Sequence, residues 1–283
     1  AMQGFIDQQG IPLLTFARQD EGWKVRQQRY APYGAQPPET VWTVPMCVRR
    51  GTERSCQLLG SAGAVVRIDG KGPLVPNAGG TGYYRFEMAE ADWAALIAKA
   101  DTLPGGEALA VADSLAASVR AGRARVVQLA ALARALANHP DSHASEAAVD
   151  AMGTLVRDGL VDAGGRKGWS AFRGKLYAPL LAHYGFDPRA GAYAREDPER
   201  AQRRVQVVER IAGTGKGKAL RQQLADAAQA WLDGDLAALD PTWFDRAFAF
   251  WIDRGGEKAA RLLVDRALAS EDPYFRPRAL GAA

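Results

Sequence analysis

Histidines are the residues of this chain best suited to hold a metal ion or to move protons, and there are three: His139, His143 and His183. The first two, in HPDSH, stand four residues apart, the spacing that places both imidazoles of the His-Glu-x-x-His zinc motif on one face of a helix. Pro140 occupies the place of the glutamate, so the general base is missing and the helix that would present the pair is broken. The segment therefore predicts a loop between helices rather than a zinc site.

A glycine-rich segment, NAGGTGYYRF at 77–86, could surround a phosphate group. A dinucleotide-binding fingerprint that begins at Gly80 and Gly82 needs a third glycine where Arg85 stands, and it must open a helix. The residues that follow the glycines are aromatic and strand-like, so the helix N-terminus that would hold a pyrophosphate is missing. We predict a glycine turn that leads into a strand, with alternate side chains on opposite faces.

Two further patterns of nucleotide-binding and catalytic proteins are also incomplete. In GTGKGKAL at 213–220, Lys218 stands where a phosphate loop that begins at Gly213 needs its second glycine, and Ala219 follows Gly-Lys in place of the hydroxyl that would hold magnesium. This segment predicts a turn between two helices. No Gly-x-Ser-x-Gly elbow is present, and neither cysteine has a histidine nearby in the sequence. We expect no catalytic, cofactor-binding or metal-binding residue in this chain.

The chain has two cysteines, in the segment VPMCVRRGTERSCQLL. If Gly51 and Thr52 form a two-residue hairpin turn, Cys47 lies directly opposite Cys56. Opposed residues of an antiparallel pair can lie close enough for a disulfide. We predict this bond, which would indicate an oxidising compartment and hence a periplasmic or secreted protein. Two free thiols in a cytoplasmic protein are the alternative.

Charge and hydrophobicity limit the partners. The net charge is +4, but the 36 basic residues are spread among 32 acidic ones, whereas nucleic-acid binders concentrate basic charge on one face or tail. The densest basic cluster, RAQRRVQVVER at 200–210, alternates with apolar residues at helical spacing and predicts a solvated helix face. No apolar run approaches the roughly 20 residues that a membrane helix needs. We therefore expect neither a nucleic-acid partner nor a membrane span.

The first third of the chain has the composition of a β-structure. Residues 1–90 hold seven of the fifteen prolines and twelve of the thirty glycines, between short runs such as WKVRQQRY and TVWTVPM. Such runs, separated by tight turns, are typical of strands. We predict a small antiparallel β-sandwich over residues 1–90.

From residue 91 the sequence becomes rich in alanine with apolar residues at helical spacing. One such stripe consists of Leu109, Ala112, Ala116 and Val119. Asp-Pro pairs at 197, 240 and 272 place an N-cap acceptor before a proline, and Gly213, Gly234 and Gly255 stand where a left-handed residue would end a helix. The pattern predicts an all-α array of helical hairpins over 91–283, a HEAT/armadillo-like solenoid, so that the whole is a two-domain α+β chain.

Several stretches, taken in order, resemble the aminopeptidase N family of zinc metallopeptidases. Downstream of its catalytic domain that family reads Trp-x-x-Gln-x-Gly-x-Pro, Gln-x-Arg-Phe, Trp-x-x-Pro-Leu, Asn and Gly-Tyr-Tyr-Arg-Val. The matching residues are Gln8, Gly10, Pro12, Gln27, Arg29, Trp42, Pro45, Asn77, Gly82, Tyr83, Tyr84 and Arg85. Phe5, Met46 and Phe86 replace the family's commoner tryptophan, leucine and valine, which are apolar exchanges. The detailed resemblance covers about residues 4 to 125.

The resemblance implies that this chain has a non-catalytic role. In that family a small β-sandwich links a thermolysin-like catalytic domain to a helical domain, which arches over the active site and limits which peptides enter. The zinc ligands and the glutamate base lie upstream of the matched region, so zinc is expected in the catalytic domain and not here. The implied partners are that catalytic domain, in the same polypeptide, and peptide substrates. The alternative is a stand-alone α-solenoid that binds a protein partner and has no peptidase activity.

Overall fold

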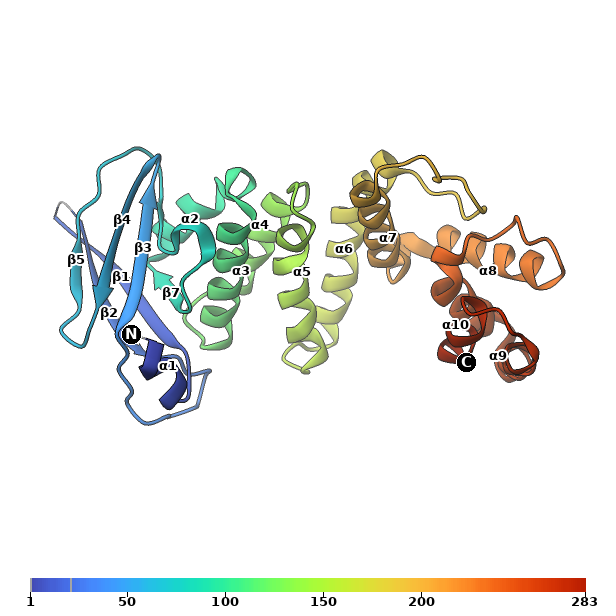
Figure 1. Ribbon diagram of the computed structural model, residues 1–283, viewed down its shortest axis with the longest axis horizontal. Coiled ribbons are helices and arrows are strands. Elements are labelled where there is room, and N and C mark those ends of the chain that lie inside the picture. Colours follow the sequence, from blue (N-terminus) through green and yellow to red (C-terminus); the bar gives the residue numbers. More distant parts are fainter. Residues whose placement is uncertain (1, 21) are drawn as a thin grey trace. The chain divides into compact units, whose positions relative to one another are not determined.

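The computed structural model describes residues 2–20 and 22–283 (Figure 1). Contacts within the chain separate it into two compact units, Ala1–Leu160 and Val161–Ala283. The first unit contains the described strands and the helices up to α5, and the second contains the later helices. The change from strands to helices comes near residue 90, as the sequence indicates. The first compact unit nevertheless continues to Leu160 and contains helices α2 to α5 as well as the strands. The division into two domains, 1–90 and 91–283, stays a prediction.

The strands of the first unit form two small sheets. The strands are β1 (Pro12–Gln19), β2 (Gly22–Arg29), β3 (Val44–Arg50), β4 (Glu53–Leu59), β5 (Ala64–Val66), β6 (Leu74–Val75) and β7 (Arg85–Met88). One sheet has the order β5-β2-β1-β7 and the other has the order β4-β3-β6. Side chains alternate between the two faces as the period of a strand requires: Val44, Met46 and Val48 of β3 are buried, whereas the residues between them are less so.

The prediction of a purely antiparallel arrangement is wrong for one pair of strands. β7 lies parallel to β1, with Leu14 opposite Phe86, while the other pairs are antiparallel. Parallel strands cannot be joined by a tight turn, and here the connection between β1 and β7 passes through the second sheet before it returns. The α+β class is therefore observed, while the terms sandwich and solenoid stay predictions.

The helices fill most of the remaining chain. In the first unit they are α1 (Met2–Asp7), α2 (Glu90–Ile97), α3 (Gly105–Arg120), α4 (Val126–Leu136) and α5 (Ser142–Arg157). In the second unit they are α6 (Ala163–Tyr184), α7 (Pro198–Ala212), α8 (Lys218–Leu232), α9 (Phe244–Ala269) and α10 (Phe275–Ala282). Within the described residues, no helix is long and apolar enough to cross a membrane.

Helix α3 buries only part of the stripe seen in the sequence: Ala112 is buried, Ala116 and Val119 are half-buried, and Leu109 is exposed. Its buried residues include Ala108, Val111 and Leu115, which pack towards the sheets and α5, whereas Leu109 is 37% exposed. The stripe correctly predicts a helix but does not mark its buried face, because an alanine-rich helix offers small apolar residues on more than one face. Packing against neighbours, rather than periodicity, selects the face that is buried.

In the second unit, the capping role predicted for Asp197 and Asp240 is confirmed, whereas the left-handed conformation predicted for three glycines is found at one of them. The carboxylate of Asp197 accepts hydrogen bonds from the amides of Glu199 and Arg200, with Pro198 as the first residue of α7. Of the three glycines expected to end helices, only Gly234 has a left-handed φ, of 112°. The predicted helix end at Gly255 is instead a kink one residue later, at Gly256 with φ of 63°, and α9 continues beyond it.

Candidate functional site

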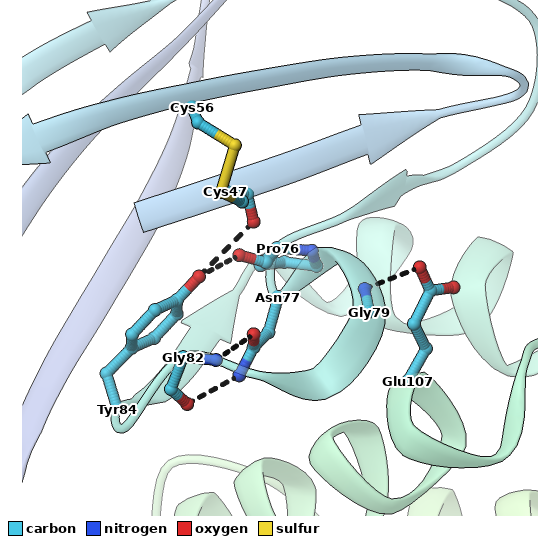
Figure 2. The surroundings of a disulfide bond; sticks show 8 residues. All are labelled: Cys47, Cys56, Pro76, Asn77, Gly79, Gly82, Tyr84 and Glu107. Atoms are coloured by element: carbon cyan, nitrogen blue, oxygen red, sulfur yellow. Dashed lines mark hydrogen bonds between the residues drawn. A yellow bond between two sulfur atoms is a disulfide. The ribbon is translucent and has the colours of Figure 1, made fainter. Parts of the chain in front are cut away.

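The glycine segment forms a closed turn between β6 and β7 (Figure 2). The buried side chain of Asn77 accepts a hydrogen bond from the amide of Gly82 and donates one to its carbonyl oxygen, each at 2.9 Å. Between them Gly80 has φ of 68°, and a Cβ atom there would lie 2.1 Å from the carbonyl oxygen of Gly106 in α3. Gly80 is therefore required by close backbone packing on α3, and Gly82 leaves room for the ring of Tyr84, so neither glycine needs a phosphate to explain it.

The two tyrosines after this turn lie on opposite faces, as the sequence predicts. Tyr84 is 6% exposed, and its hydroxyl donates to the carbonyl oxygen of Pro76 at 2.7 Å, with the carbonyl oxygen of Cys47 3.3 Å away. Burial raises the pKa of Tyr84. Tyr83 is 65% exposed. The segment thus presents one aromatic ring to the interior and one to the surface.

The hairpin that carries both cysteines has the predicted register. Gly51 and Thr52 form the turn, and Cys47 of β3 lies opposite Cys56 of β4. The two sulfur atoms form a disulfide, with a Cα–Cα distance of 4.1 Å. Figure 2 shows the bond above the hydroxyl of Tyr84. The covalent link therefore lies next to the glycine turn.

A buried carboxylate connects this region to the helices. Glu107, in the first turn of α3, is 2% exposed and accepts hydrogen bonds from Nε of Arg49 in β3 and from the amide of Gly79, each at 2.9 Å. A second nitrogen of Arg49 also contacts this carboxylate, and the pairing raises the pKa of the arginine. Because Arg49 is charged and both carboxylate oxygens accept hydrogen bonds, these contacts offset the cost of burying the charge of Glu107. One side chain thus joins a strand, the glycine turn and a helix.

Besides the pair of Arg120 with Asp158, four more arginine–carboxylate pairs join elements of the first unit. They are Arg18 with Asp92, Arg85 with Asp113, Arg123 with Glu87, and Arg125 with Glu90. Arg18 joins β1 to α2 and Arg85 joins β7 to α3. Arg123 joins the segment that follows α3 to β7. Each exposed pair adds little by itself, but together they fix the strands on the first helices. Helix α3 also contacts β7 directly, so the compact unit extends past residue 90.

The surface beside the glycine turn is hollowed along the exposed face of α3. One hollow of about 300 Å³ is lined by Ile11, Asn77, Gly80, Gly82, Tyr83, Tyr84, Arg85, Gly106, Leu109, Ala110 and Asp113. A second of about 350 Å³ shares Leu109 and Asp113 and is lined further by Ala112, Ala116, Arg120, Ala147 and Ala151. We call the two together the α3 groove. Its walls are mainly small or apolar, and its central charges, Arg85 and Asp113, neutralise each other at 2.9 Å.

The earlier residues of the sequence signature have structural contacts. Gln27 of β2 accepts a hydrogen bond from the amide of Trp42 at 2.9 Å and donates one to its carbonyl oxygen at 2.7 Å, which ties the segment before β3 to the other sheet. Gly10 has φ of 118°, and a Cβ there would lie 2.7 Å from the side chain of Arg29. Pro12 begins β1, Pro45 lies in β3 and Gln8 is exposed.

Two of the histidines, His139 and His143, lie in and after the loop between α4 and α5. Nε2 of His139 lies 2.8 Å from the carbonyl oxygen of Leu103, and its Nδ1 accepts a hydrogen bond from the amide of Asp141 at 3.1 Å. Both ring nitrogens are thus used to hold the loop between α4 and α5, while His143 is exposed on α5. In the part of the chain that the structure describes, no group of three or more His, Cys, Asp or Glu residues could hold a metal ion.

The GTGKG segment is a turn between α7 and α8, as predicted. Arg173 donates to the carbonyl oxygen of Gly213 at 3.1 Å, and Arg221 donates to those of Ala212 and Thr214. Two guanidinium groups therefore cover the C-terminal carbonyls of α7, where positive charge is favourable. No sequence motif pointed to these arginines or to Glu107, because arginines are numerous here and a glutamate in a first helical turn is common.

A comparison with protein families identifies the chain. Residues 74–283 match the model of the ERAP1-like C-terminal domain. The chain belongs to this family. The ERAP1-like C-terminal domain is the C-terminal region of M1 aminopeptidases, so the resemblance to that family seen in the sequence is confirmed. A comparison with curated proteins gave no match.

The ERAP1-like C-terminal domain match begins in β6 and includes the glycine turn, the helices from α2 to α10 and the lining of the α3 groove except Ile11. The signature residues from Gln8 to Pro45 lie before it. The match and the signature therefore overlap at Asn77–Arg85, the turn that packs on α3.

Proposed function

We propose that this chain is the non-catalytic C-terminal part of a zinc-dependent aminopeptidase that removes N-terminal residues from peptides. In this proposal the chain caps and shapes the substrate cavity of the catalytic domain of the same polypeptide. The observation that carries the proposal is the match of residues 74–283 to a domain that belongs to M1 aminopeptidases. The ordered signature between Gln8 and Arg85 supports it, since it continues the resemblance upstream of the match.

The α3 groove is the surface best suited to this role. It is lined by side chains such as Tyr83 and Leu109, which are apolar yet exposed, and by small residues that allow close approach of another chain. Glu107, which pairs with Arg49 and accepts a hydrogen bond from Gly79, ties the glycine turn beside the groove to α3. In the proposal the catalytic domain covers part of this groove, and peptide lies along the rest.

The chemistry belongs to the catalytic domain. Zinc there would supply an activated water for hydrolysis of the first peptide bond. The residues of this chain would exclude water and limit peptide length, and none of them would touch the reacting atoms. The Cys47–Cys56 disulfide is compatible with an extracellular location and supports a periplasmic or secreted parent.

The test compares this chain, the longer polypeptide encoded with it, and a truncated polypeptide that lacks residues 74–283. We expect chelator-sensitive hydrolysis of an aminoacyl reporter by the longer polypeptide and none by this chain. The truncated form, if it folds, should lose discrimination among peptides of different length. Upstream sequence without a His-Glu-x-x-His motif would contradict the proposal and favour a stand-alone interaction module, and chelator-sensitive turnover by this chain would contradict its non-catalytic role.

A further inference from the structure

The second unit contains a cavity of about 330 Å³ that the proposed function does not use. It is lined by Gly191, Tyr193, Ala194, Ala201, Gln202, Arg204, Val205, Asp240, Thr242 and Trp243. The walls come from the segment between α6 and α7, from α7 itself and from the residues that precede α9. Two aromatic rings, three small aliphatic side chains and a few polar groups have the composition of a small-ligand site.

Backbone hydrogen bonds hold the irregular wall of this cavity in place. The amide of Asp240 donates to the carbonyl oxygen of Pro188 at 2.7 Å, and the amide of Ala190 donates to that of Ala237 at 3.0 Å. The amide of Gly191 donates to the carboxylate of Asp240 at 3.2 Å. The segment before α7 is thus fixed to the segment before α9, and the cavity between them is preformed.

Arg204 is not available to a ligand, because its charge is already compensated. It is 3% exposed, pairs with both carboxylate oxygens of Glu196 and donates to the carbonyl oxygen of Tyr184 at 2.8 Å. Its guanidinium carbon lies 3.5 Å from the centre of the Tyr193 ring. The arginine therefore holds the ring that forms one wall, and it offers no free positive charge for an anion.

Asp240 is the charge that the cavity presents. Its carboxylate accepts backbone hydrogen bonds from Thr242 at 3.0 Å and from Gly191 at 3.2 Å. Over the described ranges 2–20 and 22–283, it forms no ion pair with a lysine, arginine or histidine within 4.0 Å. Burial acts to raise its pKa, but the hydrogen bonds from Thr242 and Gly191 outweigh it, so the pKa is lowered and the group is ionised at neutral pH.

We propose that this cavity binds the guanidinium or ammonium group of an arginine or lysine side chain, with Asp240 as the counter-charge. The aliphatic stem of the ligand would lie against Ala201 and Val205, and the ring of Tyr193 would flank it. A carboxylate without a cationic partner gains most from a cation in a site that water only partly fills. The inference rests on the second unit alone and does not depend on the proposed aminopeptidase function.

The experiment uses the whole chain and two cationic probes that differ in source. N-acetyl-arginine amide represents an arginine within a peptide, and agmatine represents a free alkyl guanidine. Binding is measured by isothermal titration calorimetry and by two-dimensional NMR of backbone amides. We expect one or both to bind and to shift the amides of Gly191 and Thr242, and a preference between them identifies the source. The citrulline analogue, which has the same shape without charge, should bind at least tenfold more weakly.

Two variants locate the site. Asp240→Asn keeps an oxygen that can accept from Thr242 and should weaken binding at least tenfold, whereas Asp235→Asn makes the same charge change outside the cavity and should leave it unchanged. Ala201→Phe fills the cavity without touching Asp240 and should also abolish binding. Circular dichroism identifies variants that fail to fold. Absence of binding to both cations, equal binding of citrulline, binding of inorganic phosphate instead, or full binding to folded Ala201→Phe would each overturn the proposal.

Discussion

The carboxylate of Glu107, buried at the start of α3, forms an ion pair with the guanidinium of Arg49 in β3, the central strand of the three-stranded sheet. The same carboxylate accepts a hydrogen bond from the amide of Gly79, so the glycine turn, a strand and a helix all contact this one side chain. The disulfide begins two residues before Arg49, at Cys47. The first unit is therefore held at its strand–helix junction by polar and covalent links in addition to its apolar core.

The substitution Glu107→Gln should destabilise the first unit by about 2–4 kcal/mol, because it leaves the guanidinium of Arg49 without its counter-charge at a largely buried junction. Urea unfolding, with hydrogen exchange of α3 amides to assign the effect to the first unit, is the measurement. Glu90→Gln is the matched control: both partners of the Glu90–Arg125 pair are about two-thirds exposed, and its loss should cost under about 1 kcal/mol. Equal effects for the two variants would contradict the role given to Glu107.

Gly80 should not tolerate a side chain. Its φ of 68° is unfavourable for alanine, and the added Cβ would meet the carbonyl carbon and oxygen of Gly106 at 2.3 and 2.1 Å. We expect Gly80→Ala to destabilise the first unit by about 1–3 kcal/mol or more, since backbone atoms on both sides must move. In Gly60→Ala a Cβ has open space and φ is not left-handed, so the thermal midpoint should change little. A stable Gly80→Ala variant would mean that the turn does not need to pack on α3 as described.

Local chemistry explains which parts of the fold could be predicted from the sequence. The hairpin register followed from a two-residue turn at Gly51 and Thr52, and the start of α7 followed from Asp197 and Pro198, because in each case the information lies within a few neighbouring residues. The glycine turn was predicted as a turn, but its packing on Gly106 depends on residues far apart in the sequence.

Non-local features could not be predicted from the same patterns. The parallel partner of β1 depends on the path of the whole chain between the sheets. The buried face of α3 depends on its neighbours, so helical spacing alone could not show that Leu109 lines a groove. Asp240 was predicted only as a cap. That it also faces a cavity became evident only when the segments before α7 and before α9 were seen to lie together.

The disulfide should stabilise the first unit chiefly by restricting the unfolded hairpin. Cys47 and Cys56 are nine positions apart in the sequence, and closing a loop of this size contributes about 2–3 kcal/mol in the chain-entropy treatment. Replacing both cysteines with serine should lower the thermal midpoint and increase hydrogen exchange in β4, most of whose side chains are exposed. Mass spectrometry after alkylation should find no free thiol before reduction and two afterwards. Two alkylated thiols in the unreduced protein would remove the bond and the argument for an oxidising compartment.

Acid should weaken the second unit through Glu196. Hydrogen bonding to Arg204 lowers the pKa of this carboxyl below its ordinary value, so it binds fewer protons in the folded than in the unfolded protein. The resulting stability is present above the unfolded pKa of about 4.3 and is lost as the pH falls through the folded value. Glu196→Gln should therefore lower the urea midpoint at pH 7, and the difference from the unmodified chain should shrink at pH 3. Arg204 would be left buried over Tyr193 without its carboxylate.

Asp197 is unsuitable as a control because it caps α7, whereas Glu199→Gln changes a neighbouring carboxylate outside this pair and should leave the pH dependence intact. A difference between Glu196→Gln and the unmodified chain that is the same at both pH values would mean that the pairing with Arg204 is not linked to protonation of Glu196.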